Sequence, residues 1–220
     1  MTIRAVGFDL DDTLAVSERD RAAVLREALT AVGGPEVADE ISRADYVDAH
    51  TRHADSRSRE PIFADLLADH DVDPAVATAR YRETLGETLA AVGGADGLLA
   101  DVRAEYDLGL LTDGPPRAQR AKLAAFGWAD AFDAVVVTGD LATRKPDPAA
   151  FRALLDALGV DPGEAAYVGD HPERDVAGAD AVGLRTVQVL GPGDDPVERA
   201  DAHVRRDALA DTLPRVLSDL

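Results

Sequence analysis

The chain has 220 residues, of which 46% are hydrophobic, so it can form a packed core domain with room for an insertion. Its formal net charge is −19, from 42 acidic and 23 basic residues, which argues against nucleic acid or anionic membranes as partners. It has no cysteine and no apolar run near the ~20 residues of a membrane span, so we expect a soluble, cytoplasmic protein without disulfides or thiolate-bound metal.

The N-terminal part predicts one buried strand followed by a long helical block. Residues Ile3 to Phe8 form a short, mostly apolar run that ends abruptly at Asp9, as expected of a buried parallel strand. In residues 16–92 helix formers dominate, and arginine and acidic residues recur at helical spacing. Breaks that would separate four helices fall at Gly33-Gly34-Pro35, Glu60-Pro61 and Asp73-Pro74.

After Gly93-Gly94 the patterns of strand and helix alternate. Strands are predicted at 108–111, 135–137, 165–168 and 185–190, and helices at 115–127, 148–158, 175–182 and from Asp207 onwards, with Pro214 interrupting the last. Such alternation predicts a parallel sheet covered by helices on both faces. We therefore expect an α/β, Rossmann-like core formed by residues 1–15 and 93–220, with residues 16–92 inserted as an α-helical cap domain.

Two carboxylates follow the first predicted strand. Asp9 and Asp11 are separated by one residue at the carboxyl end of the strand, which is the edge of an open parallel sheet where ligands bind. This spacing lets both side chains face one crevice. The alternative is an acidic helix N-cap, in which Asp11 or Asp12 caps the helix and Thr13 assists.

A second strand end carries Thr112, Asp113 and Gly114. A hydroxyl group and free backbone N–H groups at this position suit the oxygens of a bound phosphate. An ordinary strand-to-turn connection, in which Asp-Gly is common, explains the same residues and is favoured when the segment is taken alone.

Lysine is nearly absent, since only Lys122 and Lys145 accompany the arginines. An acid-rich, lysine-poor composition is typical of adaptation to high salt, although a GC-rich genome would produce it too. Any lysine used in chemistry must be one of these two. Lys145 precedes a helix opened by proline, and its compact ammonium could contact a carboxylate and a phosphoryl group together. A solvated residue before that helix is the alternative.

A fourth segment supplies two further acids. The strand at 165–168 leads into Gly169 and Asp170, and Asp175 follows at the start of a helix. Mg²⁺ prefers hard oxygen ligands from one or two carboxylates, with water and phosphate completing its six positions. Asp170 fits as a ligand, and Asp175 fits as a ligand or as support for one. The helix dipole would explain Asp175 but not Asp170.

Together, in this order and at these strand ends, the four segments resemble the haloacid dehalogenase superfamily of hydrolases. The run from Tyr167 to Ala179, followed by Ala181-Val182-Gly183, is similar to the family's fourth motif over its whole length. The resemblance extends from Phe8 to about Gly183 and implies a helical cap inserted after the first motif.

The resemblance also implies a role for each residue. Asp9 would be the nucleophile that forms an aspartyl-phosphate, and Asp11 would protonate the leaving oxygen and later deprotonate water. Contacts with the phosphoryl group are expected from Thr112, Asp113, Gly114 and Lys145. The Mg²⁺ site is expected to draw on Asp9, Asp11, Asp170 and Asp175.

Two features separate activities within the family. Dehalogenase members lack an acid at the position of Asp11, and phosphonate-cleaving members use a cap lysine, whereas residues 16–92 contain no lysine. We therefore predict a Mg²⁺-dependent phosphatase for a small phosphorylated metabolite, such as phosphoglycolate, a sugar phosphate or a nucleoside monophosphate. The alternatives are a phosphomutase using the same phospho-aspartate and, in another class, a binding protein that keeps the fold without turnover.

The predicted cap also contains arginine and histidine candidates. Arg52, Arg57 and Arg59 could contact an anionic substrate, but balancing the acidic surface is the favoured explanation for them. His50 and His53 lie one helical turn apart without an accompanying acid cluster. We interpret both as surface residues.

Overall fold

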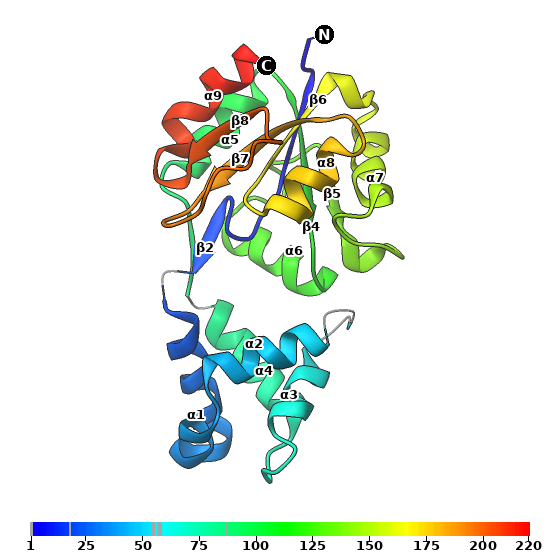
Figure 1. Cartoon of the computed structure of the whole chain (residues 1–220). Coiled ribbons are helices and arrows are strands. Elements are labelled where there is room, and N and C mark those ends of the chain that lie inside the picture. The colour runs from blue at the N-terminus through cyan, green and yellow to red at the C-terminus, as the bar shows by residue number, and fades with distance from the viewer. Residues whose placement is uncertain (1, 18, 54–55, 57–58, 87) are drawn as a thin grey trace. The chain divides into compact units, whose positions relative to one another are not determined.

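The computed structural model describes residues 2–17, 19–53, 56, 59–86 and 88–220. The chain divides into two compact units, an α/β unit of Met1–Val16 and Ala91–Leu220 and a helical unit of Ser17–Ala90 (Figure 1). The chain passes from one unit to the other in strands β2 (Ala15–Ser17) and β3 (Leu89–Ala91). These two short strands pair as a separate two-stranded sheet, which the sequence patterns do not predict.

The α/β unit is built on a six-stranded parallel sheet with the order β5-β4-β1-β6-β7-β8. Its strands are β1 (Ala5–Phe8), β4 (Asp107–Thr112), β5 (Ala134–Val137), β6 (Ala165–Gly169), β7 (Arg185–Leu190) and β8 (Ala202–Arg205). In the central strand β1, Phe8 is in register with Leu110 of β4 and with Val168 of β6. The predicted α/β class with a parallel sheet is therefore confirmed.

Helices cover both faces of this sheet (Figure 1). The α-helices of the unit are α5 (Ala95–Arg103), α6 (Pro116–Ala125), α7 (Pro148–Leu158), α8 (Gly178–Asp180) and α9 (Leu209–Asp219). Val6 and Phe8 of β1 belong to a core shared with α5 and α9, whereas Ala5 belongs to a core shared with α7. Side chains alternate between the faces of a strand, so β1 is buried on both sides. At Gly7 a Cβ atom would come within 2.7 Å of Leu154 on α7, so any side chain there would displace the neighbours packed against the strand.

Some elements differ from the sequence-based prediction. Helix α5 and strand β8 are not among the predicted elements, and β8 contains His203 and Arg205, which interrupt any apolar run. The helix predicted at 175–182 begins earlier, as a single π-helical turn at Pro172–Ala177 that continues into α8. The ring nitrogen Nδ1 of His171 accepts hydrogen bonds from two backbone N–H groups of that turn, which explains the earlier start.

The helical unit contains four helices in its described residues, which is the predicted number, although the boundary between the first two is not the predicted one. They are α1 (Arg21–Glu40), α2 (Arg43–Arg52), α3 (Glu60–Leu66) and α4 (Pro74–Gly86). The rings of Tyr46, Phe63 and Tyr81 pack in its core with centroids 5.3 to 5.9 Å apart. The first expected break is instead a kink inside α1, where Gly34 has a φ of 82° that glycine adopts without strain. Among the described residues, no helix is both long and apolar enough to cross a lipid bilayer.

Candidate active site

The site lies where the order of the strands reverses. The chain leaves β1 for β4 and β5 on one side of the sheet and later adds β6, β7 and β8 on the other. Ligands of open parallel sheets bind beyond the carboxyl ends of the strands at such a switch point. Asp9 directly follows β1, and its backbone N–H donates to the carbonyl oxygen of Val168 at 2.9 Å, which fixes the backbone of Asp9 against β6.

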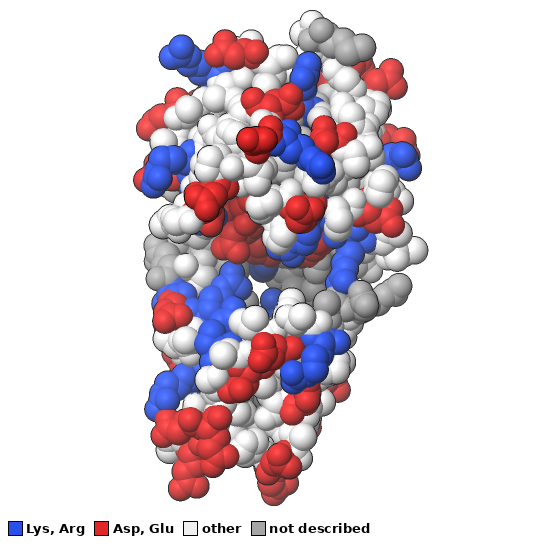
Figure 2. Space-filling view, in the orientation of Figure 1, with Lys and Arg blue, Asp and Glu red and all other residues white. Residues whose placement is uncertain are grey.

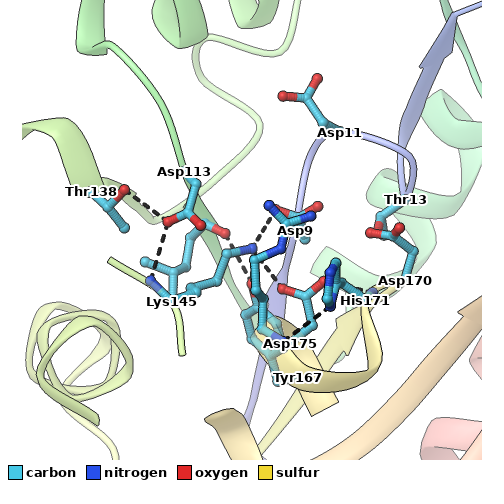
Figure 3. A network of polar contacts seen from close by, with 12 residues as sticks. Asp9, Asp11, Thr13, Asp113, Thr138, Lys145, Tyr167, Asp170, His171 and Asp175 are labelled. Carbon is cyan, nitrogen blue, oxygen red and sulfur yellow. Dashed lines mark hydrogen bonds and ion pairs between the residues drawn. The ribbon is translucent and has the colours of Figure 1, made fainter. Parts of the chain in front are cut away.

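A buried lysine connects the strand ends. Lys145, just before α7, donates from Nζ to Oδ1 of Asp9 and to Oδ1 of Asp175, both at 2.6 Å (Figure 3). The same nitrogen donates to the hydroxyl of Tyr167 at 3.2 Å. An ammonium group has three N–H donors, and these contacts use all three. The tyrosine is itself fixed, because its hydroxyl donates to the carbonyl oxygen of Leu111 at 2.9 Å.

Three carboxylates form a group that could hold a metal ion. Asp9, Asp170 and Asp175, together called the Asp cluster below, each offer an oxygen, and these oxygens lie within 4.8 Å of one another. The backbone allows this approach at Gly169, where a Cβ atom would come within 2.5 Å of the Cβ atom of Asp175. Oδ2 of Asp175 accepts the backbone N–H of His171 at 2.9 Å. With Oδ1 on Lys145, both oxygens of Asp175 are engaged, which suits a supporting position more than a ligand position.

The Asp cluster has three carboxyl groups and one ammonium group in contact with them, so full ionisation would leave an excess of negative charge. Burial raises the pKa of Asp9 well above its usual range, and Lys145 reduces this effect only in part. Burial, followed by the charges of Asp175 and Asp12, raises the pKa of Asp170 to about 7. Burial alone would lower the pKa of Lys145, but Asp9 and other anionic neighbours outweigh it and raise that pKa. The lysine therefore remains an ammonium, and the three carboxylates favour a further cation.

The end of β4 braces the loop that carries Lys145. Oδ1 of Asp113 accepts the hydroxyl of Thr138 at 2.8 Å and the backbone N–H of Lys145 at 3.2 Å. Asp113 thus fixes the loop, and its predicted contact with substrate stays a prediction. Thr112 is buried at the end of β4, and Gly114 has a φ of 135°, which only glycine adopts readily.

Asp11 is engaged elsewhere. In the part of the chain that the structure describes, Asp11 is not among the acids whose oxygens lie together. Nζ of Lys122 donates to both of its oxygens at 2.6 Å, and Nε2 of Gln119 donates to Oδ2 at 2.9 Å. Figure 3 shows the Asp11 side chain pointing away from Asp9. Its expected role as a metal ligand therefore finds no counterpart in the Asp cluster.

Two residues of the site are absent from the sequence-based prediction. Tyr167 is a residue of the buried strand β6, and nothing in its local sequence distinguishes it from a core aromatic. Lys122 could have been recognised, because the chain has only two lysines and each contacts a carboxylate of the site. The scarcity of lysine could have identified Lys122 as well as Lys145.

The candidates in the helical unit have local partners. Nε and Nη2 of Arg52 donate to Oδ2 of Asp65 at 2.9 and 2.7 Å, so this arginine has a surface ion pair. The guanidinium of Arg59 lies 5.8 Å from the ring centroid of Tyr81. Arg57 falls outside the described residues. Contacts of these arginines with a substrate remain predictions.

Comparisons with known proteins agree with this geometry. A family model described as haloacid dehalogenase-like hydrolase matches residues 3–183. A phosphoserine phosphatase of Thermus thermophilus is 37% identical over 84% of this chain, which spans only 61% of that protein's length. A phosphoglycolate phosphatase of Cereibacter sphaeroides is 34% identical over 97% of this chain and 99% of its own length. The crystal structure of a HAD phosphatase from Thermococcus onnurineus matches with 29% identity and a TM-score of 0.72, covering 96% of this chain and 98% of that one.

Proposed function

The chain belongs to the haloacid dehalogenase-like hydrolases and is a phosphoric monoester hydrolase. On this basis we propose that it cleaves a small phosphate monoester through an aspartyl-phosphate on Asp9, with Mg²⁺ as cofactor. The observation that carries the proposal is the position of Lys145. Its ammonium binds Oδ1 of Asp9 at 2.6 Å inside a buried site. It therefore orients the carboxylate and places a positive charge where an anionic phosphate must approach.

The proposed reaction has two halves. In the first, Oδ2 of Asp9 attacks phosphorus, the ester P–O bond breaks, and Asp11 gives its proton to the departing oxygen. In the second, water attacks the same phosphorus and gives a proton to Asp11. The bond between Asp9 and phosphorus then breaks, and inorganic phosphate leaves. A carboxylate attacks an anionic phosphate poorly unless cations offset the repulsion, and Lys145 supplies one such charge.

The donor set of the Asp cluster supports Mg²⁺ as the cofactor. Carboxylate oxygens are the ligands that Mg²⁺ prefers, and a bound cation would offset the charge of the three carboxylates when they are ionised. Asp9 and Asp170 would hold the ion, and Asp175 would support them through Lys145. When bound, the ion would supply Lewis-acid stabilisation of the phosphoryl oxygens.

The relatives support a small metabolite as the substrate. The two named above are a phosphoserine phosphatase and a phosphoglycolate phosphatase. Both names denote a phosphate monoester on a short carbon chain that also bears a carboxylate. We therefore place substrates of this size and charge first among the candidates, ahead of sugar phosphates and nucleoside monophosphates.

The test is release of inorganic phosphate from a panel of monoesters, measured with Mg²⁺ and with EDTA. We expect release from at least one small ester, dependent on Mg²⁺, and a loss of about 10⁴-fold or more in Asp9→Asn. Acid-quench labelling with a ³²P-labelled substrate should trap phosphate on the wild type but not on the variant. Near wild-type release by Asp9→Asn would overturn the covalent mechanism. Isomerisation of a hexose 1-phosphate without net phosphate release would favour a phosphomutase instead.

A further inference from the structure

Helix α6 approaches the site with two polar side chains that the proposed reaction does not use. Gln119 and Lys122 lie three positions apart on α6, and residues at this spacing share one face of a helix. Gln119 is buried and Lys122 exposes 21% of its side chain. Both donate to the carboxylate of Asp11, which lies more than 100 positions earlier in the chain. This face of α6 is therefore directed at one acidic group.

The contacts fix the carboxylate of Asp11 at several points. Lys122 binds both oxygens at 2.6 Å, and Gln119 binds Oδ2 at 2.9 Å. The amide of Gln119 is held in turn, because Nε2 also donates to the carbonyl oxygen of Asp113 at 2.5 Å. A Cβ atom at Gly114 would come within 2.9 Å of that amide nitrogen, so the glycine leaves space for it. The end of β4 and helix α6 together thus set the orientation of Asp11.

This geometry fits the requirement for a general acid in an in-line reaction. The leaving oxygen departs on the side of phosphorus opposite to the attacking Asp9, so its proton donor must lie away from Asp9 rather than beside it. Asp11 points away from Asp9 (Figure 3). When Asp11 gives up its proton, negative charge develops on its carboxyl group, and an ammonium in contact stabilises that charge.

We propose that Lys122, assisted by Gln119, is a positioning residue that orients Asp11 for proton transfer to the leaving group and stabilises the carboxylate formed in that step. The proposal rests on the proposed function, because it assigns Asp11 the role of general acid. Lys122 acts through Asp11 and not on the phosphoryl group. Substitution of Lys122 should therefore lower kcat/KM most for substrates whose leaving oxygen must be protonated.

Two esters with different leaving groups test this proposal. An alkyl phosphate accepted in the panel above leaves as a poor alkoxide and needs the proton, whereas p-nitrophenyl phosphate leaves as a stabilised phenolate. For Lys122→Met we expect kcat/KM to fall about tenfold to a hundredfold with the alkyl ester and about twofold or less with the aryl ester. Lys122→Arg keeps a cation able to bind both oxygens, and it should recover most of the alkyl activity. The ratio of the two esters within one preparation is unaffected by any loss of folded protein.

Two control variants make the outcome decisive. Arg120→Ala removes a cation two positions away on α6, whose partner at 2.6 Å is the exposed Asp140, and it should leave the ester ratio unchanged. Asp11→Asn should show the full selective loss. If Asp11→Asn does so but Lys122→Met loses both esters equally, loses neither or gains activity, the positioning role is overturned and the proposed function stands. If the wild type releases phosphate from no ester, the proposed function itself fails.

Discussion

Charged side chains occupy opposite environments in the two units of the molecule. In the α/β unit the ion pair between Lys145 and Asp9 leaves only 4% and 8% of the side chains exposed. In the helical unit the pair between Arg52 and Asp65 has a similar N–O distance of 2.7 Å but leaves 58% and 34% exposed. Burying an ion is costly unless a partner compensates it, whereas solvent screens an exposed pair. Ion pairs of similar length therefore contribute differently to stability in the two units.

The two units also differ in what their interiors contain, and this difference indicates which unit carries the catalytic groups. Acidic and basic side chains are spread over the visible surface of both units (Figure 2). The core of the helical unit is apolar and aromatic, with Phe63 fully buried between Tyr46 and Tyr81. The α/β unit has an apolar core as well, but it also buries Asp9, Asp175 and Lys145 at the strand ends, with Asp170 only partly exposed beside them. Buried charge that adds nothing to packing is a frequent mark of a functional site.

The largest effect should follow removal of the buried ammonium. Lys145→Met leaves Asp9 and Asp175 without their shared partner, so we expect phosphatase activity to fall by about 10³-fold or more. Stability should fall by about 3–5 kcal/mol at neutral pH, because two buried carboxylates become uncompensated. Urea unfolding and phosphate release measure the two effects. If Lys145→Met were active and as stable as the wild type, the buried ammonium would be needed for neither catalysis nor stability.

The next effect concerns the helical unit. Phe63→Ala creates a cavity among the aromatic rings, and we expect a loss of about 3–5 kcal/mol in the free energy of unfolding. Val76→Ala, at a side chain that is 52% exposed, serves as the control and should change stability by less than about 0.5 kcal/mol. Urea unfolding followed by circular dichroism distinguishes the two. Equal effects of both variants would mean that this core is not what stabilises the unit.

A smaller effect depends on pH. The pKa of Asp170 is about 7 in the folded chain against an ordinary 3.8, so the folded state retains a proton that the unfolded state has lost between these values. Stability from this group is complete below pH ~4 and is lost as the pH rises through ~7. Without divalent ions, Asp170→Asn should therefore be more stable than the wild type above pH 7, by at most about 4 kcal/mol, and equal to it near pH 4.

Thermal unfolding with and without Mg²⁺ completes that test. Mg²⁺ should raise the melting temperature of the wild type at pH 8, because the proposed site is formed only in the folded state, and should raise that of Asp170→Asn less. Identical pH profiles for the two proteins would remove Asp170 as the source of the pH dependence. Comparing the variant with the wild type cancels the general repulsion of a chain with a net charge of −19.

The smallest effect is expected at the exposed ion pair. Arg52→Ala should lower the melting temperature by about 2 °C or less, because solvent already screens the charge that faces Asp65. The difference from the wild type should shrink further in molar KCl. If Arg52→Ala lost as much stability as Lys145→Met, solvent exposure would not determine how much an ion pair stabilises this chain.

The sequence by itself determined the class of the fold and much of the candidate site. Most predicted strands are short, largely apolar runs, and Asp9, Thr112 and Asp170 stand at or just beyond the ends of β1, β4 and β6. Parallel strands bring their carboxyl ends to one edge of the sheet, so local patterns suffice to place these residues at the same edge. In the second unit, helices α3 and α4 likewise begin at the local breaks Glu60-Pro61 and Asp73-Pro74.

Only the tertiary structure decided which side chains contact which. Lys145 meets Asp9 across 136 positions, and Lys122 meets Asp11 across 111, so no local pattern contains either pair. The contact of Tyr167 with Lys145 depends on which face of β6 the ring occupies, and a strand buried on both faces has no polar alternation to reveal it. Strand pairing and helix packing fix these directions, and they depend on the whole chain at once.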